Sequence, residues 1–113
     1  MKHGFITLAA VVPDISVAAP GKNLQEILSL TQQAAEQGAH VVCFPELTLT
    51  GCTCGDLLLT DLVLDAAEQA LLAYVKASAA WDILAFVGVP LRDNGRIYNC
   101  AAAVSRGDRK SVV

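Results

Sequence analysis

A single carboxylate, Glu46, stands where the sequence favours chemistry. It follows the apolar segment 41–44 through Pro45 and precedes a stretch of small and polar residues. The apolar segment has the composition of a buried strand, and catalytic groups gather at the carboxyl ends of strands in open α/β sheets. A carboxylate there loses part of its hydration, which raises its pKa and makes it a usable general base near neutral pH. The structural alternatives are that Glu46 caps the next helix or pairs with an arginine.

The four cysteines offer a second source of chemistry. Cys52 and Cys54 form a Cys-x-Cys pair, but a metal site needs four ligands, and neither histidine has a useful spacing to them. We therefore expect loop packing and no metal. Cys43 and Cys100 lie within apolar, strand-like segments, where free thiols are commonly buried. This usage favours a reducing cytoplasm over a secreted, disulfide-bonded domain.

The first half of the sequence predicts a β-α-β unit that places Glu46. Residues 5–12 are a continuous apolar run, typical of a strand buried on both faces. Apolar residues then recur at helical spacing over 24–35, with Asn23 and Glu26 predicted as a capping box and Gly38 as the stop. Residues 41–44 follow as the second strand. A helix between two strands predicts parallel neighbours.

The second half predicts a helix and an antiparallel pair of strands. Helical spacing marks residues 64–75, and residues 83–89 and 97–104 are strand-like. Asp93-Asn94-Gly95 supplies turn residues between these strands, so we expect a hairpin. Arg106-Gly107-Asp108 predicts another turn, with a fifth strand beginning near 111. The fold class is therefore α/β with a mixed sheet, starting β-α-β-α-β-β.

Smaller features receive structural interpretations. We expect Trp81 to be a packing anchor at a helix-to-strand junction and His40 to be a partly exposed edge residue. Tyr98 is expected to pack and Asn99 to satisfy a local backbone group, although both could instead orient an active-site loop.

Length and composition set the organisation. The 113 residues suffice for one compact domain, and 54% are hydrophobic against only 17% charged. Such a small, charge-poor chain is expected to cover part of its surface with more protein, as a subunit of a homo-oligomer or as a piece of a longer chain. We expect truncation, because the sequence stops within an apolar segment.

Several partners and locations are excluded by the same counts. A net charge of −3 with scattered lysines and arginines argues against nucleic acid. No apolar run approaches the roughly 18 residues of a membrane span. Lys2 and His3 before the run 5–12 imitate a secretion signal, but the run is short and Pro13 ends it. We expect a cytoplasmic protein.

The segment around Glu46 resembles a known signature. Strand-Phe-Pro-Glu-Leu followed by Thr-Gly is similar to the first motif of the nitrilase, or carbon–nitrogen hydrolase, superfamily. The longer string over 44–57, with its Thr-Cys-Gly-Asp-Leu ending, resembles the glutaminase domains of bacterial glutamine-dependent NAD+ synthetases. The order of elements agrees along essentially the whole chain. The resemblance implies that residues 1–113 are the N-terminal portion of one such domain.

The resemblance also implies a fold and a reaction. The family has an αββα sandwich and a Glu-Lys-Cys triad, in which Glu46 matches the base. The Cys thiolate attacks the amide of glutamine, ammonia leaves, and water hydrolyses the thioester. In the intact synthetase the ammonia would serve NAD+ synthesis in a second domain, which would use ATP and magnesium. Glutamine and the remainder of the synthetase chain are therefore the expected partners, and no cofactor is expected within this segment.

Two departures limit what the resemblance carries over. The family's catalytic Lys follows the strand that begins near Ser111, so Lys110 does not match it, and the nucleophilic Cys lies further on. We therefore expect the segment alone to be inactive. Cys52 replaces the usual Tyr, and substrate-binding residues stay unassigned. Two alternatives remain open, a fragment of a free-standing nitrilase-type amidase and a non-catalytic α/β binding module.

Overall fold

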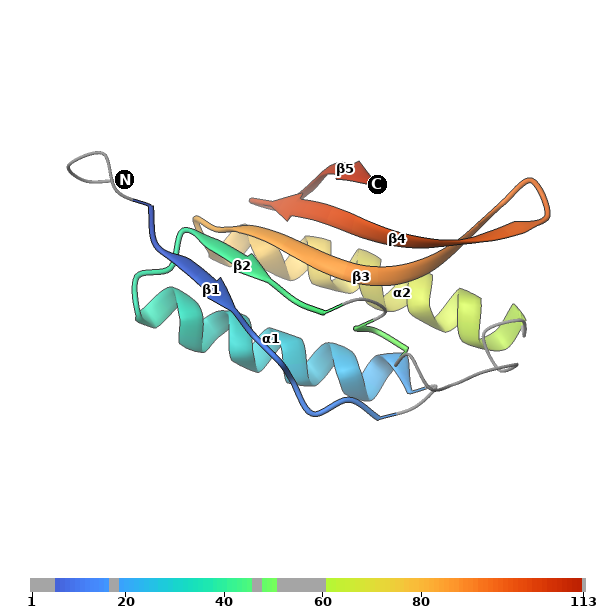
Figure 1. Ribbon diagram of the computed structural model, residues 1–113, viewed down its shortest axis with the longest axis horizontal. Coiled ribbons are helices and arrows are strands. Elements are labelled where there is room, and N and C mark those ends of the chain that lie inside the picture. The colour runs from blue at the N-terminus through green and yellow to red at the C-terminus, as the bar shows by residue number, and fades with distance from the viewer. Residues whose placement is uncertain (1–5, 17–18, 46–47, 51–60, 113) are drawn as a thin grey trace.

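A five-stranded mixed sheet with two helices is the architecture of the chain (Figure 1). The computed structural model describes residues 6–16, 19–45, 48–50 and 61–112, and the side chains up to Arg109. The predicted α/β fold class with a mixed sheet is confirmed. The elements are β1 (Leu8–Ala10), α1 (Pro20–Glu36), β2 (Val41–Cys43), α2 (Asp61–Ala77), the short 3-10 helix η2 (Ser78–Ala80), β3 (Leu84–Asp93), β4 (Arg96–Ser105) and β5 (Asp108–Val112).

The strands lie in sequence order, β1-β2-β3-β4-β5. The predicted β-α-β unit is confirmed, because β1 pairs parallel with β2 and β2 pairs parallel with β3. The predicted hairpin is also confirmed, since β3 and β4 pair antiparallel from Ala85↔Val104 to Asp93↔Arg96. β5 returns antiparallel to β4, with an irregularity between Ala103 and Val104. β3 therefore has a parallel neighbour on one side and an antiparallel neighbour on the other.

Helix α1 begins three residues before the predicted cap. Its first residue is Pro20, whose missing N–H and fixed φ suit the first helical position. Ala19 is the N-cap residue and makes no side-chain capping bond, so the predicted capping box of Asn23 and Glu26 is wrong. Asn23 is buried inside the helix and bonds to distant backbone groups instead. The predicted stop is correct, because Gly38 adopts a φ of +82°.

The two helices meet through a buried pair of hydroxyls. Thr31 of α1 and Tyr74 of α2 are both fully buried, and their oxygens lie 2.8 Å apart. The Tyr74 ring packs edge-on against Phe44 and is tilted against Trp81, each at a centroid distance of 6.4 Å. The Trp81 indole N–H also donates to Gln32 Oε1 at 2.7 Å, which confirms Trp81 as a packing anchor. The predicted spacing of α2 is confirmed by its buried residues Val63, Leu64, Ala67, Ala70, Leu71 and Tyr74.

Both predicted turns require backbone conformations that few residues adopt. Asn94 and Gly95 have φ values of +50° and +76° in the β3–β4 hairpin. Arg106 and Gly107 have φ values of +51° and +81° between β4 and β5. The Gly107 N–H donates to Ser78 Oγ at 2.8 Å, and a Cβ on Gly107 would lie 3.2 Å from the Cβ of Ala79. The turn therefore docks onto η2, where glycine is needed for both its φ and its small size.

An exposed ion pair accompanies that turn. The Arg106 guanidinium donates from Nε to Asp82 Oδ1 at 2.8 Å, and its Nη2 contacts the same oxygen. This hydrogen bond and the arginine's positive charge lower the pKa of Asp82. Because both side chains are exposed, the pair adds little stability and serves mainly to orient the turn.

Both helices lie on one side of the sheet, and the other side is open (Figure 1). Alternate residues of a strand point to opposite faces. Val42, Val87 and Ala102 are fully buried on the helix side, whereas Cys43 on the open side is exposed. The expectation of a buried thiol is therefore wrong for Cys43, and Cys100 is only half-buried. Tyr98, predicted to pack, is 45% exposed.

The first strand is the edge of the sheet. Thr7 O accepts a hydrogen bond from Val41 N–H, and Val11 N–H donates to Cys43 O at 3.0 Å. Odd-numbered residues thus direct their backbone groups toward β2, and Leu8 and Ala10 direct theirs away. The prediction of a strand buried on both faces is wrong, since Leu8 is 70% exposed. Helix α1 covers a single face of this edge strand, so Ala9 is half-buried and its neighbours Leu8 and Ala10 are exposed.

His40 occupies the place expected for it. It is half-buried beside β1, and its Nδ1 accepts a hydrogen bond from Thr7 N–H at 2.9 Å. In the part of the chain described, no helix is long and apolar enough to cross a membrane.

The buried phenol predicts a specific loss of stability at high pH. Burial raises the pKa of Tyr74 to about 12, although the hydrogen bond with Thr31 acts in the opposite direction. In the unfolded chain the phenol has its ordinary pKa of about 10. The protonated phenol therefore contributes roughly 2–3 kcal/mol to the free energy of unfolding below about pH 10, and this contribution is lost as the pH rises through about 12. We expect Tyr74→Phe to weaken this pH dependence in urea unfolding between about pH 9 and 12. An equally steep alkaline loss in both proteins would contradict the assignment.

Candidate active site

The sheet is interrupted just after β2, where the sequence predicts chemistry. Phe44 N–H donates to Phe86 O at 3.0 Å, as a regular parallel ladder requires. Among the described residues, the next bond to β3 is from Leu49 N–H to Gly88 O at 3.2 Å. The chain thus advances five residues while β3 advances two. In a regular parallel ladder, successive bonds are two residues apart on both strands. The pairing between the chain after β2 and β3 is therefore irregular over this interval.

A pocket of about 300 Å³ opens beside this interruption. Three parts of the sheet form it: the end of β2, the middle of β3 and the facing part of β4. Its size suits a small molecule, and its walls are mainly apolar, as in most such sites. The lining residues are Phe44, Pro45, Phe86, Gly88, Asn99, Cys100 and Ala101.

The predicted base lies outside the described residues. The structure describes Pro45 before Glu46 and Thr48 after Leu47, but not Glu46 itself. The Thr48 hydroxyl donates to Pro45 O, and Thr48 is buried, so the two flanks contact each other. Cys52 and Cys54 also lie outside the described residues. Lys110 belongs to β5 by its backbone. Among the described residues no three His, Cys, Asp or Glu side chains gather closely enough to hold a metal ion.

The segment that rejoins β3 is held by a buried amide from α1. Asn23 Nδ2 donates to Leu49 O at 3.0 Å and to Ser16 O at 2.8 Å. Its Oδ1 accepts from Ser16 N–H at 2.7 Å. Asn23 is 1% exposed and Leu49 is fully buried, so the bond between them forms in a low-dielectric interior, whereas the two bonds to Ser16 are only partly buried.

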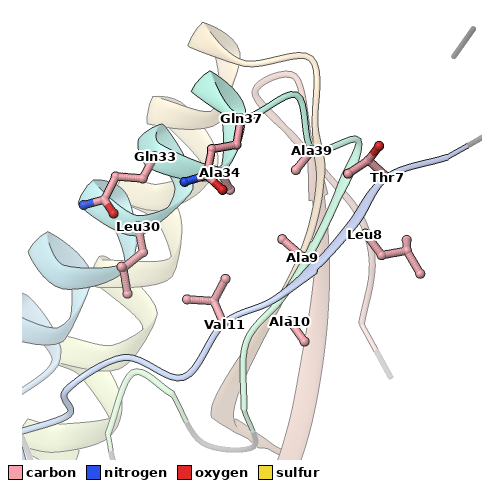
Figure 2. A pocket seen from close by; sticks show the side chains of 10 residues that line it. All are labelled: Thr7, Leu8, Ala9, Ala10, Val11, Leu30, Gln33, Ala34, Gln37 and Ala39. Atoms are coloured by element: carbon pink, nitrogen blue, oxygen red, sulfur yellow. The ribbon is translucent and has the colours of Figure 1, made fainter.

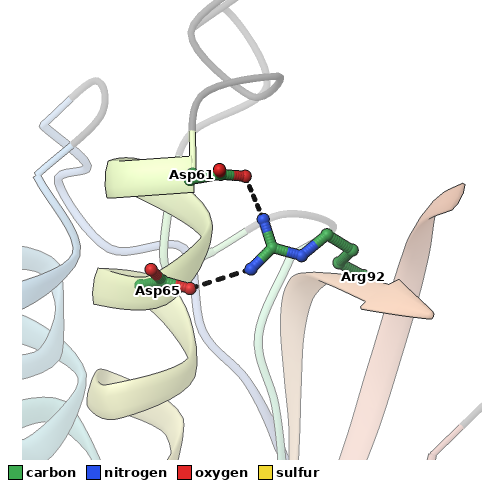
Figure 3. Close-up of polar contacts among 3 residues, drawn as sticks. All are labelled: Asp61, Asp65 and Arg92. Carbon is green, nitrogen blue, oxygen red and sulfur yellow. Dashed lines mark hydrogen bonds and ion pairs between the residues drawn. The ribbon is translucent and has the colours of Figure 1, made fainter. Parts of the chain in front are cut away.

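The beginning of α2 is held from the hairpin. Arg92 on β3 contacts Asp61 through one guanidinium nitrogen and Asp65 through the other, the latter at 3.0 Å (Figure 3). Asp61 is the first residue of α2, where a carboxylate also interacts favourably with the helix dipole. The carboxylates are 83% and 64% exposed, so these ion pairs add little to the stability of the fold and mainly orient the start of α2 relative to β3.

A second pocket, of about 330 Å³, lies at the far edge of the sheet between β1 and α1 (Figure 2). Val11 and Leu30 point into it, and Gln33 and Gln37 border it from α1 (Figure 2). None of its lining residues is an acid, a base or a nucleophilic thiol. The pocket beside Pro45 is therefore the better candidate for chemistry.

Sequence reasoning located the strand end and missed the residues around it. Asn99 was expected to satisfy a local backbone group or to orient an active-site loop, and the structure places it in the lining of the pocket. Asn23 was assigned to a helix cap, and nothing was assigned to Arg92 or Phe86. One signal was present for Asn23, because asparagine is a poor residue for a helix interior and needs another reason to be there.

Comparison with known proteins places these features in a wider context. The model of the carbon-nitrogen hydrolase family matches residues 7–111. A glutamine-dependent NAD(+) synthetase of Mycobacterium tuberculosis is 40% identical over 112 residues, which cover 99% of this chain and 16% of that protein. The synthetase of Xylella fastidiosa is 36% identical, covering 91% of this chain and 19% of its own length. The chain thus spans less than a fifth of these curated relatives.

Solved structures agree with the sequence relatives. A glutamine-dependent NAD(+) synthetase from Cytophaga hutchinsonii superposes with a TM-score of 0.87 at 29% identity, covering 95% of this chain and 18% of that one. An amidase from Nesterenkonia sp. gives a TM-score of 0.78 at 19% identity over 99% of this chain and 43% of that one. The second likeness is one of fold alone.

The cluster at the start of α2 predicts a small and salt-sensitive effect. Arg92→Ala should lower the free energy of unfolding by less than about 1 kcal/mol at low salt, since its partners are exposed. In about 1 M NaCl, where the Debye length is about 3 Å, most of the difference should vanish. Arg109→Ala, at an exposed arginine on β5, is the control for losing a charge. A difference that persists undiminished at high salt would show that the contact is not ionic.

Proposed function

The chain belongs to the carbon–nitrogen hydrolase family, and we propose that it is the first part of a glutaminase domain that releases ammonia from glutamine for NAD+ synthesis. The match to glutamine-dependent NAD(+) synthetases along 99% of the chain carries this proposal. The pocket beside Pro45 supports it, because its volume suits a small molecule and Pro45 directly precedes the predicted base in the sequence. The enzyme is a glutamine-dependent NAD+ synthetase, and residues 1–113 are the N-terminal portion of its glutaminase domain.

In this proposal Glu46 works as a proton shuttle. It takes the proton of a cysteine thiol supplied by the remainder of the protein, and the thiolate attacks the amide carbon of glutamine. The carbonyl oxygen becomes an oxyanion beside a lysine from that remainder. The C–N bond then breaks, and the proton passes from Glu46 to the leaving ammonia. Water, activated by Glu46, hydrolyses the thioester to glutamate and restores the thiol.

The pocket walls suit the chemistry that this proposal assigns to Glu46. Phe44, Phe86 and Ala101 are apolar, and a carboxylate that acts against apolar walls loses part of its hydration. Desolvation raises a carboxyl pKa toward neutrality, where one group can both accept and return a proton.

ATP and Mg²⁺ belong to the synthetase reaction in the remainder of the protein, in the cytoplasm. Glutamine is the substrate, and the assembly is a homo-oligomer.

The open face of the sheet has a place in the same proposal. The remainder of the domain covers it with a second sheet, giving the αββα sandwich. Cys43 is exposed on that face and Phe86 beside it is only half-buried, as expected for a surface that another layer covers.

Glu46→Gln in the intact protein tests the reaction. The amide keeps the size of the side chain but cannot accept the thiol proton, so glutamine-dependent NAD+ synthesis should fall by about 10²- to 10⁴-fold. Synthesis from free ammonia should be retained, because it bypasses the thioester. Both rates are measured in one assay with either nitrogen source. Normal glutamine turnover by this variant would overturn the role of Glu46.

The open face predicts that residues 1–113 expressed alone will self-associate, as measured by sedimentation velocity. Phe86→Ser on the open face should reduce the association. Leu72→Ser, at a residue that is 51% exposed on α2, is the matched control and should not. A compact monomer formed by the unsubstituted chain would contradict the half-sandwich.

A further inference from the structure

Asn23 makes a set of contacts that its place in a helix does not require. It is the fourth residue of α1 and 1% exposed, and its carboxamide bonds to no other helical residue among those described. Both Nδ2 hydrogens are used, one on Ser16 O and one on Leu49 O, while Oδ1 accepts from Ser16 N–H. One side chain therefore joins the chain before α1 to the chain after β2.

The contact with Leu49 completes a pair of fixed points. Leu49 is held on one side by its N–H bond to Gly88 O on β3, and on the other by its carbonyl bond to Asn23. Phe44 is held by Phe86 O and by ring contact with Tyr74. The chain from Phe44 to Leu49 is thus fastened at both ends. The first fastening belongs to the sheet and its core, and the second depends on Asn23.

We propose that Asn23 is a positioning residue for the proposed glutaminase site, acting through Leu49 on the segment that carries Glu46. This inference rests on the proposed function, because its activity test measures glutamine-dependent NAD+ synthesis. Its physical basis is that a proton-transfer group works only within hydrogen-bond reach of its partner, and that a shift of about 1 Å can cost about 10²-fold in rate. Asn23 does not touch the reacting atoms.

Thr31 supplies a matched control on the same helix. It is also fully buried, and its hydroxyl donates to Ile27 O at 2.7 Å and pairs with the Tyr74 hydroxyl at 2.8 Å. Its polar contacts join α1 to α2 and do not reach the segment after β2. Thr31→Val therefore removes a buried polar contact of α1 without releasing Leu49.

The first experiment measures NAD+ synthesis by the intact protein with glutamine and with free ammonia, well below the melting temperature of the least stable variant. Asn23→Ala should lower glutamine-dependent kcat by about 10- to 100-fold and leave the ammonia-dependent rate unchanged. Asn23→Asp keeps the side-chain size and the acceptor for Ser16 N–H but loses the donors to Leu49 O and Ser16 O, so it should act in the same direction. Thr31→Val should leave the ratio of the two rates within about twofold of the parent value.

The pH profile separates positioning from general weakening. If Asn23 places Glu46, both Asn23 variants should shift the acidic limb of kcat/KM for glutamine, since that limb reports the essential base. Thr31→Val should not move it. An unchanged rate ratio with an unchanged acidic limb in the Asn23 variants would overturn the inference.

Backbone hydrogen exchange tests the same inference without any assay of glutamine. The Leu49 N–H should exchange at least about tenfold faster in Asn23→Asp than in the parent, and at the parent rate in Thr31→Val. Equal exchange in all three proteins would overturn the positioning role, even if Glu46→Gln behaves as proposed. The converse result is also distinguishable. If the parent protein does not hydrolyse glutamine, but the exchange of Leu49 N–H still depends on Asn23, the proposed function is overturned and the contact between Asn23 and Leu49 still stands.

Discussion

The buried Tyr74 side chain is the contact on which the helix layer depends. Its hydroxyl meets Thr31 of α1, and its ring meets both Phe44 at the end of β2 and Trp81 beyond η2. A hydroxyl removed from water costs free energy unless it is paired, so α1 and α2 can pack closely only in the relation that brings these two oxygens together. The same ring fixes Phe44, which is the last regular residue before the predicted catalytic segment. Tyr74 thus links the helix layer to the end of β2.

Unequal strand lengths then account for the pocket. β2 is three residues long, whereas β3 and β4 each have ten, so the hairpin continues well beyond the end of its parallel neighbour. Beyond the end of β2, the described chain bonds to β3 again at Leu49, and the pocket is bounded by Phe44 and Pro45 on one flank and by Asn99 and Ala101 on the other. The change from parallel to antiparallel pairing at β3 thus marks the place for a ligand, much as a switch in strand order does in open α/β sheets.

The sequence predicted those features that depend on neighbours along the chain. Helical spacing located α1 and α2, and Asn94-Gly95 located the hairpin turn, because both signals act over a few residues. The capping box at Asn23 failed for the opposite reason, since the groups that bind its carboxamide lie seven and 26 residues away in sequence. Cys43 was misjudged because composition does not tell which face of a strand is covered. The pocket is lined by residues of β3, of β4 and of the chain just after β2, and no pattern of neighbouring residues predicts which of them will lie side by side.

The position of β1 at the edge of the described sheet has a consequence for how the chain meets other chains. An unpaired strand edge can recruit other chains, and backbone pairing of this kind leads to aggregation. Within β1, Leu8 and Ala10 direct their backbone groups outward, along a strand of three residues. So short an edge offers a foreign strand too few hydrogen bonds to hold it, which is one of the ways natural sheets resist edge-to-edge assembly. The short length of β1 thus protects the chain against fibre formation.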